Sequence, residues 1–276
     1  MKFMDFCAGI GGGRFGLENI GFECVAYSEI DDDASKTYSL FFDDKEINYG
    51  DLMKINPHDL PYFDLMIAGF PCQTFSIAGK REGLADQRGL IIYGLIKILK
   101  AKKVKYFLFE NVKGLVNHNK GKTLMKILDE LDKAGYIVEW KLLNSLNYGV
   151  PQMRERVYFI GIRKDLVHTN VRFSWPDEVE TPDLKWYLCD TENSELEFKN
   201  DTTFNRYLNN KYNAGKFDLN EILKKDYLIL DTRQSDLRLY RDKVPTLRAG
   251  RHGILYVKDR KLRKLSGYES LLLQGF

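Results

Sequence analysis

The sequence has little cysteine and no long hydrophobic run. Its four cysteines lie far apart and form no CxxC pair: Cys7, Cys24, Cys72 and Cys189. This spacing indicates neither a zinc cluster nor a disulfide framework, so we expect reduced thiols and no metal. The longest apolar segment, residues 90–99, is interrupted by Lys97 and is too short to cross a bilayer, and no signal-like stretch follows Met1. We therefore expect a cytoplasmic protein with no membrane partner.

The sequence also has little net charge. It carries 42 basic and 39 acidic residues, a balance of +3 that is too small to make the whole molecule a binder of polyanions. The distribution is uneven, because residues 233–264 hold eleven Lys or Arg against three Asp, whereas residues 177–203 hold nine acidic residues against two Lys. The basic stretch predicts a phosphate-facing surface, with a solvated charged face as the alternative.

What the sequence does contain, up to about residue 163, is an alternation of β-rich and helical segments. The expected strands are 2–6, 23–29, 64–70, 106–112, 137–145 and 156–163, and the expected helices are 14–20, 32–42, 90–102 and 122–134. This order predicts an α/β fold with a mostly parallel sheet covered on both faces. The Pro-rich and acidic, then Asn-rich, sequence after Lys164 predicts a smaller, loop-rich lobe.

A glycine-rich turn follows the first expected strand, at the sheet edge where open parallel sheets bind ligands. Gly11, Gly13 and Gly16 match the GxGxxG spacing. Glu29 ends the second strand and could accept hydrogen bonds from ribose hydroxyls, and Asp51 follows a short extended segment. These features predict a nucleoside-containing cofactor without choosing between a dinucleotide and S-adenosylmethionine. A tight turn with no ligand is the alternative interpretation.

Cys72 follows the third expected strand, within the sequence GFPCQTFS at 69–76. Pro71 stiffens the turn before it, and the polar run that continues to Gly89 is long enough to act as a lid. A lone cysteine is more often a small buried hydrophobic residue. Its position at the carboxyl end of a strand nevertheless favours a nucleophile.

Glu110 ends the next strand and is expected at the same sheet edge as Cys72. A protonated Glu110 could donate to a ring nitrogen, and Arg154 and Arg156 point the same way on an extended chain and can share an anionic target. A thiol, a carboxyl and two arginines indicate covalent chemistry on an electron-poor ring. Thiolate attack on carbon 6 of cytosine would let carbon 5 take a methyl group from a sulfonium donor. A dehydrogenase would explain only the glycines.

The order of these motifs resembles the cytosine-5 DNA methyltransferase family. The resemblance covers nearly the whole chain through DFCAGIGGG, GDL, GFPCQTFS, FENVKGL, LNYGVPQMRERVYFIGIR and VPTLRAGRHG. It implies a Rossmann-like S-adenosylmethionine-dependent methyltransferase fold with a target-recognition lobe. It also implies S-adenosyl-L-methionine as cofactor and double-stranded DNA as partner, with the target cytosine flipped out of the duplex.

The resemblance implies a role for each motif residue. Cys72 is then the nucleophile, Glu110 engages ring nitrogen 3, and Arg156 holds the exocyclic oxygen. Gln152 and Arg154 arrange the site, and Asn111 braces the Pro–Cys turn. The implied cofactor-binding residues are Cys7, Gly9, Gly11, Gly12, Glu29, Ile30, Asp51, Leu52 and Pro71. The expected DNA-binding residues are Gln73, Ser76 and Arg88 of the closing loop, and Arg233, Arg248 and Arg251 of the basic stretch.

The resemblance also implies the domain organisation. We expect a catalytic and cofactor-binding domain at 1–163, a target-recognition lobe at 164–258 and a segment returning to the catalytic domain at 259–276. Family members continue past QGF with a further Asn-containing segment, so a second chain that supplies it is an expected partner. The expected function is sequence-specific DNA cytosine-5 methylation in a bacterial or phage restriction system. A non-catalytic DNA-binding subunit, or half of a two-chain enzyme, and a transfer-RNA methyltransferase are the alternatives.

Overall fold

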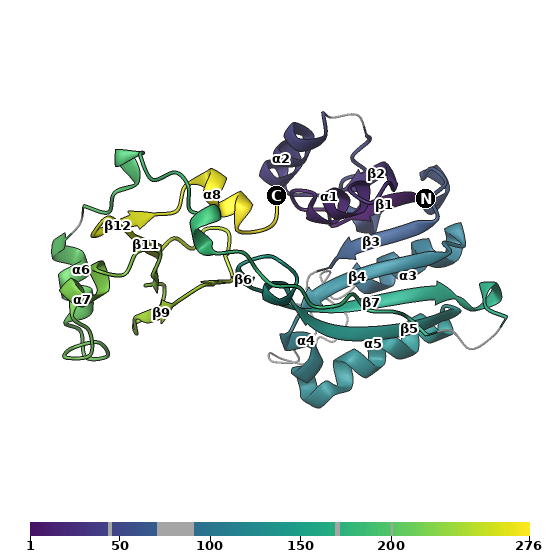
Figure 1. Cartoon of the computed structure of the whole chain (residues 1–276). Helices are drawn as coiled ribbons and strands as arrows, with labels where there is room; N and C mark the ends of the chain where they lie inside the picture. The colour runs from purple at the N-terminus through teal and green to yellow at the C-terminus, as the bar shows by residue number, and fades with distance from the viewer. Residues whose placement is uncertain (44–45, 71–90, 169–171, 200) are drawn as a thin grey trace. The chain divides into compact units, whose positions relative to one another are not determined.

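The computed structural model describes residues 1–43, 46–70, 91–168, 172–199 and 201–276 (Figure 1). The chain divides into two compact units. The first unit comprises Met1–Leu143 and Glu155–Trp175, and the second comprises Asn144–Arg154 and Pro176–Phe276. This division differs from the expected domains at 1–163, 164–258 and 259–276, since Asn144–Arg154 and the last residues group with the second unit.

The first unit contains a six-stranded sheet in the order β2-β1-β3-β4-β7-β5 (Figure 1). Its strands are β1 (Lys2–Phe6), β2 (Glu23–Ser28), β3 (Leu65–Gly69), β4 (Tyr106–Val112), β5 (Tyr136–Asn144) and β7 (Glu155–Arg163). Strands β2, β1, β3 and β4 pair in parallel, and β7 pairs antiparallel to β4. The predicted α/β class with a mostly parallel sheet is confirmed.

Five α-helices connect or flank these strands in the described part of the first unit: α1 (Gly12–Glu18), α2 (Asp32–Phe42), α3 (Ile91–Lys102), α4 (Gly114–Asn117) and α5 (Lys122–Lys133). The strands alternate between two apolar clusters, as the two-residue period of a strand requires. Met4, Met66 and Phe107 join the cluster that contains residues of α3 and α5. Phe3 and Leu65 join the cluster that contains Leu17 of α1. Helices therefore cover both faces of the sheet.

The start and end of α2 show how local sequence sets these elements. The Asp31 side chain accepts a hydrogen bond from the backbone N–H of Ala34 at 2.8 Å, and Asp32 and Asp33 occupy the first turn. Carboxylates at this end of a helix cap its N–H groups and interact favourably with its dipole. Asp43 ends the helix in the left-handed region, with φ 58°. The helix therefore begins directly after the end of β2, where Glu29 lies.

The second unit contains a four-stranded sheet in the order β12-β11-β8-β9 and a parallel pair of β10 with β6. The strands are β6 (Gln152–Met153), β8 (Ile229–Asp231), β9 (Arg238–Tyr240), β10 (Val244–Pro245), β11 (Ile254–Lys258) and β12 (Lys261–Lys264). Its α-helices are α6 (Asp201–Leu208), α7 (Leu219–Leu223) and α8 (Gly267–Leu272). Pairing of β6 with β10 explains why the segment around Gln152 belongs to this unit.

No helix among the residues that the structure describes combines the length and the apolar character needed to span a bilayer.

Candidate functional site

The carboxyl ends of four parallel strands meet at one edge of the first unit's sheet. The register pairs Phe6 of β1 with Ser28 of β2 and with Ala68 of β3, and it pairs Gly69 of β3 with Glu110 of β4. The residues that follow these positions are Cys7, Glu29 and Phe70. The strand register thus brings the glycine turn, the Glu29 carboxylate and the Glu110 carboxylate to the same edge, as the sequence predicted.

The glycine turn after β1 depends on backbone conformations that side chains disfavour. Gly9 and Gly11 lie in the left-handed region, with φ 56° and 90°. A Cβ at Gly11 would lie 2.3 Å from the ring of Phe42, so only glycine fits there. A Cβ at Gly9 would meet no atom within 4 Å. The turn therefore leaves open space beside Gly9, directly before the start of α1, where Gly12 lies.

The Glu29 carboxylate is oriented by three backbone N–H groups. Its Oε2 accepts from Gly9 at 2.7 Å, and its Oε1 accepts from Ile30 and Asp31 at 2.8 Å each. Since each carboxylate oxygen has two lone pairs, one acceptor position remains on Oε2. Glu29 is half-buried beside the open space at Gly9. This arrangement suits a ligand that presents hydroxyl groups.

Asp51 and Leu52 follow a short segment that runs beside β2. The Asp51 side chain caps the 3₁₀ turn Leu52–Lys54 by accepting from the Met53 N–H at 2.9 Å, and Leu52 is buried in the core of the first unit. Asn48 bridges this segment to the end of β2, because its Oδ1 accepts from both Glu29 N–H and Gly50 N–H. Sequence reasoning missed Asn48, since its partners on β2 and α2 lie far from it along the chain.

Two described thiols of the first unit are not ionised: Cys7 lies at this edge, and Cys24 lies near the opposite end of β2. Burial raises the pKa of the Cys7 thiol to about 12, with Glu29 and Asp5 adding to the effect. Burial also raises the pKa of the Cys24 thiol to about 12. A neutral thiol is a poor nucleophile, so Cys7 and Cys24 do not compete for that role. Cys72, with Pro71, Gln73, Ser76 and Arg88, lies outside the described residues.

Glu110 and Arg156 form an ion pair across two neighbouring strands. Arg156 of β7 lies opposite Val112 of β4 and reaches diagonally to Glu110, placing its Nε 2.7 Å from Glu110 Oε1. The side chains of Arg156 and Glu110 are 15% and 27% exposed, so solvent screens the pair only partly. The other carboxylate oxygen, Oε2, faces Gly69, where a Cβ would lie 3.7 Å from it. The carboxyl group thus lies directly beside the strand end that leads to Cys72.

Asn111 anchors the backbone that precedes the Pro–Cys turn. It is 1% exposed, and its Nδ2 donates to the carbonyl oxygen of Phe70 at 2.9 Å. Its Oδ1 accepts from the Val112 N–H at 2.8 Å. The Phe70 ring also packs edge-on against Phe109, with centroids 6.0 Å apart. Phe70 is therefore held at both its carbonyl and its ring.

Gln152 and Arg154 belong to the second unit, whereas Arg156 belongs to the first. The buried Gln152 amide donates to the Leu273 carbonyl at 3.1 Å and accepts from the Leu247 N–H at 3.3 Å. The Arg154 backbone N–H donates to Asn144 Oδ1 at 3.1 Å. The structure therefore gives Gln152 a definite role within its own unit, tying β6 to the chain after β10 and to the end of α8.

A buried charged cluster beneath the glycine turn was not expected from the sequence. Arg14 of α1 is 4% exposed; its Nε lies 2.8 Å from Glu18 and its Nη1 lies 2.6 Å from Glu46. Its guanidinium also stacks over the Phe42 ring, 4.1 Å from the centroid. The neighbouring Asp5 is 3% exposed, and its Oδ2 has no hydrogen-bond partner within the described residues. Burial therefore raises the pKa of Asp5 well above its ordinary value, although Arg14 opposes the shift.

The basic stretch of the second unit separates into bound and exposed cations. Arg233 does not fit the predicted phosphate surface, because it is largely buried, binds both carboxylate oxygens of Asp231 and donates to the Thr246 carbonyl. The Arg233 side chain is only 11% exposed, and its guanidinium is already engaged by these partners. In contrast, Arg241, Arg248 and Arg251 are exposed, and no ion pair involves them within the described part of the chain.

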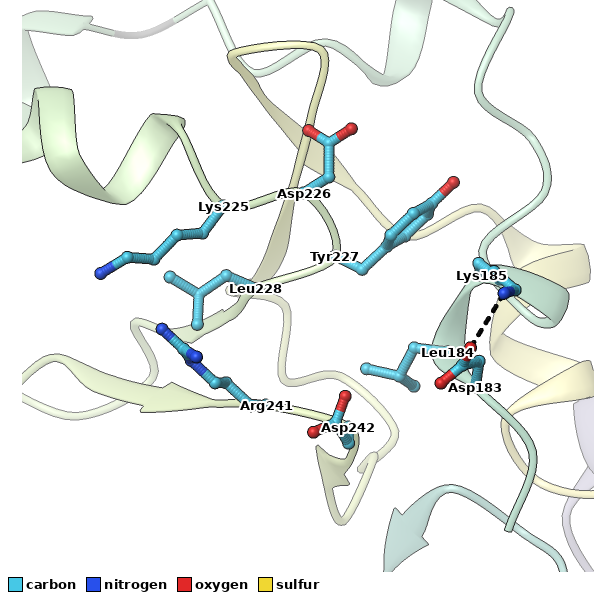
Figure 2. Close-up of a pocket in the computed structure, with 9 residues that line it drawn as sticks. All are labelled: Asp183, Leu184, Lys185, Lys225, Asp226, Tyr227, Leu228, Arg241 and Asp242. Carbon is cyan, nitrogen blue, oxygen red and sulfur yellow. Dashed lines mark ion pairs between the residues drawn. The ribbon is translucent and has the colours of Figure 1, made fainter.

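A pocket of about 300 Å³ lies in the second unit (Figure 2). Its lining mixes both charges with apolar groups: Asp183, Leu184, Lys185, Lys225, Asp226, Tyr227, Leu228, Arg241 and Asp242. Lys185 is already paired with Asp183 at 2.9 Å, as the dashed line shows. None of the residues predicted to bind cofactor or perform chemistry lines this pocket. Among all residues that the structure describes in either unit, no group of three or more His, Cys, Asp or Glu side chains could hold a metal ion.

Comparisons with solved structures agree with this fold. The crystal structure of S. pombe Dnmt2 methyltransferase superposes with a TM-score of 0.69 at 18% identity, covering 100% of this chain and 87% of that one. A Spodoptera frugiperda DNMT2 mutant gives a TM-score of 0.59 at 25% identity, covering 71% of this chain and 62% of that one. The predicted fold of an S-adenosylmethionine-dependent methyltransferase is confirmed.

Sequence comparisons identify the family. The chain is 34% identical over 280 residues to the type II methyltransferase M.DsaV of Dactylococcopsis salina, covering 100% of this chain and 76% of that protein. It is 39% identical over 196 residues to the type II methyltransferase M.HhaI of Haemophilus parahaemolyticus, covering 71% of this chain and 59% of that protein. The orphan methyltransferase M.Rho11sI of Bacillus phage rho11s is 45% identical over 173 residues, and the match spans 62% of this chain and only 34% of the phage protein. A family model described as C-5 cytosine-specific DNA methylase matches residues 1–276, and the chain therefore belongs to the C-5 cytosine-specific DNA methylase family.

Proposed function

We propose that this chain transfers a methyl group from S-adenosyl-L-methionine to carbon 5 of cytosine in double-stranded DNA, through a covalent adduct on Cys72. The observation that carries the proposal is the Glu110–Arg156 ion pair at the sheet edge, because its carboxyl group lies beside Gly69, and Gly69 closely precedes Cys72 in the sequence. A carboxyl and a guanidinium in that position can engage the polar edge of a pyrimidine while a thiolate attacks its carbon 6. Membership of the family supports the same chemistry.

The residues of the glycine turn fit S-adenosylmethionine. The open space at Gly9 lets a ligand approach the backbone, and the half-buried Glu29 carboxylate beside it suits the ribose hydroxyls. Asp51 and Leu52 would contact the adenine, and the neutral Cys7 would form part of the cofactor wall without reacting. When bound, the cofactor supplies an electrophilic methyl group on a sulfonium centre.

The chain's own groups would carry the remaining steps. The Cys72 thiolate would form a bond to carbon 6 of the flipped cytosine. Glu110, having first taken up a proton from solvent, would donate that proton or a strong hydrogen bond to ring nitrogen 3. Electron density would then reach carbon 5, which takes the methyl group from the sulfonium centre, so that the donor leaves as S-adenosyl-L-homocysteine. Water acting as a base would take the proton from carbon 5, which reforms the ring double bond and expels the thiolate. Ring nitrogen 3 would return its proton to Glu110. Arg156 fixes the Glu110 carboxyl and holds the exocyclic oxygen of the base, and Asn111 holds Phe70 before the nucleophile.

The proposal is tested by measuring incorporation of labelled methyl groups into unmethylated phage DNA that contains many sequences, with transfer RNA as a second substrate. Glu110→Gln should lower the rate at least about 100-fold, in line with the usual contribution of general acid catalysis. Glu130→Gln on α5 is the matched control and should leave the rate unchanged, because Glu130 lies on a helix and its one ion pair within the described residues is with Lys133.

Duplex DNA that contains 5-fluorocytosine tests the covalent step separately. The wild-type chain should form an adduct that survives denaturation, and Cys72→Ser should not form it. No adduct and no methyl transfer by the wild-type chain would contradict the proposal and favour a non-catalytic DNA-binding role. Methyl transfer to transfer RNA but not to DNA would refute the DNA assignment while leaving the chemistry in place.

A further inference from the structure

The proposed cofactor site is assembled from segments that no continuous element holds together. Glu29 follows β2, whereas Asp51 comes after α2 and a connecting segment. A ligand that contacts both residues needs their carboxylates at a fixed separation. The described contacts between these two segments therefore decide whether the ribose and adenine positions are formed before the ligand arrives.

Asn48 supplies the most direct of these contacts. Its Oδ1 accepts hydrogen bonds from the backbone N–H of Glu29 at 3.0 Å and from that of Gly50 at 2.9 Å. Its Nδ2 donates to the Glu29 carbonyl at 3.1 Å and to Ser35 Oγ at 3.0 Å. A primary amide offers two donors and two acceptor lone pairs, so these four bonds use its full capacity. One side chain thus joins the end of β2, the first half of α2 and the residue before Asp51.

The backbone around Asn48 follows β2 closely. Tyr27 N–H donates to the Ile47 carbonyl at 3.1 Å, and Tyr49 N–H donates to the Tyr27 carbonyl at 2.8 Å. Ser28 Oγ donates to the Gly50 carbonyl at 2.7 Å. Gly50 then turns the chain toward Asp51 with φ 61°.

Glu46 anchors the start of the segment through its ion pair with Arg14 at 2.6 Å. The Asn48 amide, on the Gly50 N–H, and the Ser28 hydroxyl, on the Gly50 carbonyl, together constrain the direction in which the chain leaves Gly50.

We infer that Asn48 is a positioning residue for S-adenosylmethionine, which sets the separation of the Glu29 and Asp51 carboxylates without itself reacting. The inference rests on the proposed function, because it assigns these carboxylates to the ribose and adenine of that cofactor. Preorganised binding groups avoid the entropic cost of ordering a loop when the ligand binds. Loss of the Asn48 bonds should therefore weaken cofactor binding and leave the chemical step unaffected.

The test uses S-adenosyl-L-homocysteine as the probe and isothermal titration calorimetry with the full chain. Asn48→Ala removes all four hydrogen bonds and should raise Kd about tenfold, as expected for solvent-exposed bonds of modest net strength. Asn48→Ser keeps one acceptor oxygen and should give a smaller increase. Asn56→Ala is the matched control. Like Asn48, the Asn56 side chain accepts from a backbone N–H, here that of His58, and its amide also donates a hydrogen bond, here to the Asp59 carboxylate. Its Kd should stay within about twofold of wild type.

Steady-state methyl transfer separates positioning from general damage. Asn48→Ala should raise KM for S-adenosylmethionine in proportion to Kd and leave kcat within about twofold of wild type, since uniform binding is lost without a change in the transition state. An unchanged Kd in both Asn48 variants would overturn the inference, as would a kcat that falls while KM is constant. If Asn48→Ala does not fold, the Ser variant decides by the same criteria. Failure of the wild-type chain to bind the probe would instead contradict the proposed function.

Discussion

Asn111 offers the most direct test of how the sheet positions the nucleophile. Asn111→Asp keeps the oxygen that accepts from the Val112 N–H but replaces the Nδ2 donor, so the Phe70 carbonyl loses its partner. Asn111→Ala removes both bonds. Because the side chain is only 1% exposed, water cannot replace either partner without rearrangement.

The expected cost follows from the number of buried groups left without a partner. Each such group costs about 1–3 kcal/mol, so Asn111→Asp should lower the free energy of unfolding by that amount and Asn111→Ala by about 2–5 kcal/mol. For a domain of this size, about 1 kcal/mol corresponds to a Tm change of about 2–4 °C. Asn111→Asp should therefore lower Tm by about 2–12 °C. Both variants should also slow adduct formation with 5-fluorocytosine DNA, because the backbone before Cys72 is no longer held.

Differential scanning calorimetry and the trapping assay together check this reasoning. Asn19→Ala is the control, because Asn19 is exposed and no side-chain bond of it is described; its Tm should match wild type. If Asn111→Asp melts at the wild-type temperature and traps DNA at the wild-type rate, the hydrogen bond to Phe70 neither stabilises the chain nor positions the nucleophile. A lower Tm with an unchanged trapping rate would leave Asn111 a purely structural role.

Two further predictions concern charge. Burial raises the pKa of Asp5 in the folded state, so above about pH 4 the folded chain retains a proton that the unfolded chain has lost. The free energy of unfolding of the wild-type chain, relative to that of Asp5→Asn, should therefore fall as pH rises. Urea unfolding in which the difference between wild type and Asp5→Asn does not depend on pH would contradict this prediction. Replacing the exposed Arg241, Arg248 and Arg251 by Gln should reduce the salt-dependence slope of DNA binding by about 0.9 for each phosphate that the variant no longer neutralises. The matched control replaces three exposed lysines of α3 and α5 by Gln: Lys97, Lys100 and Lys126. An equal reduction of the salt-dependence slope in this control would refute the placement of the DNA-binding surface.

Several parts of the fold could be predicted because their signals are local. The β-rich composition of residues 2–6 and 106–112 predicted β1 and β4 with their observed bounds, and the acidic start of α2 predicted the whole of that helix. Glu29 and Glu110 could be placed at one edge because parallel strands present their carboxyl ends together. These inferences need only the local amino-acid sequence of each segment and the geometry of a parallel sheet.

The structure differs from the sequence-based predictions where the outcome depends on the environment of a side chain. A charge count treats all arginines of the basic stretch alike, yet Arg233 is largely buried on Asp231 whereas Arg248 is exposed. The two compact units differ from the expected domains, and within the second unit Gln152 bonds to Leu273, far along the chain. Neither the burial of a single side chain nor a hydrogen bond between residues far apart in the chain produces a periodic pattern in the sequence.

The order of residues along this chain was enough to establish its α/β class, its motif residues and the sheet edge at which they gather, because strand periodicity and parallel pairing act over short stretches. The folded arrangement alone revealed that Asn48 joins Glu29 to Gly50, that Arg14 is buried between Glu18 and Glu46, and that Arg233 is occupied. Those facts depend on which polar groups meet in space and on how much water reaches them, and both are set by contacts between distant parts of the chain.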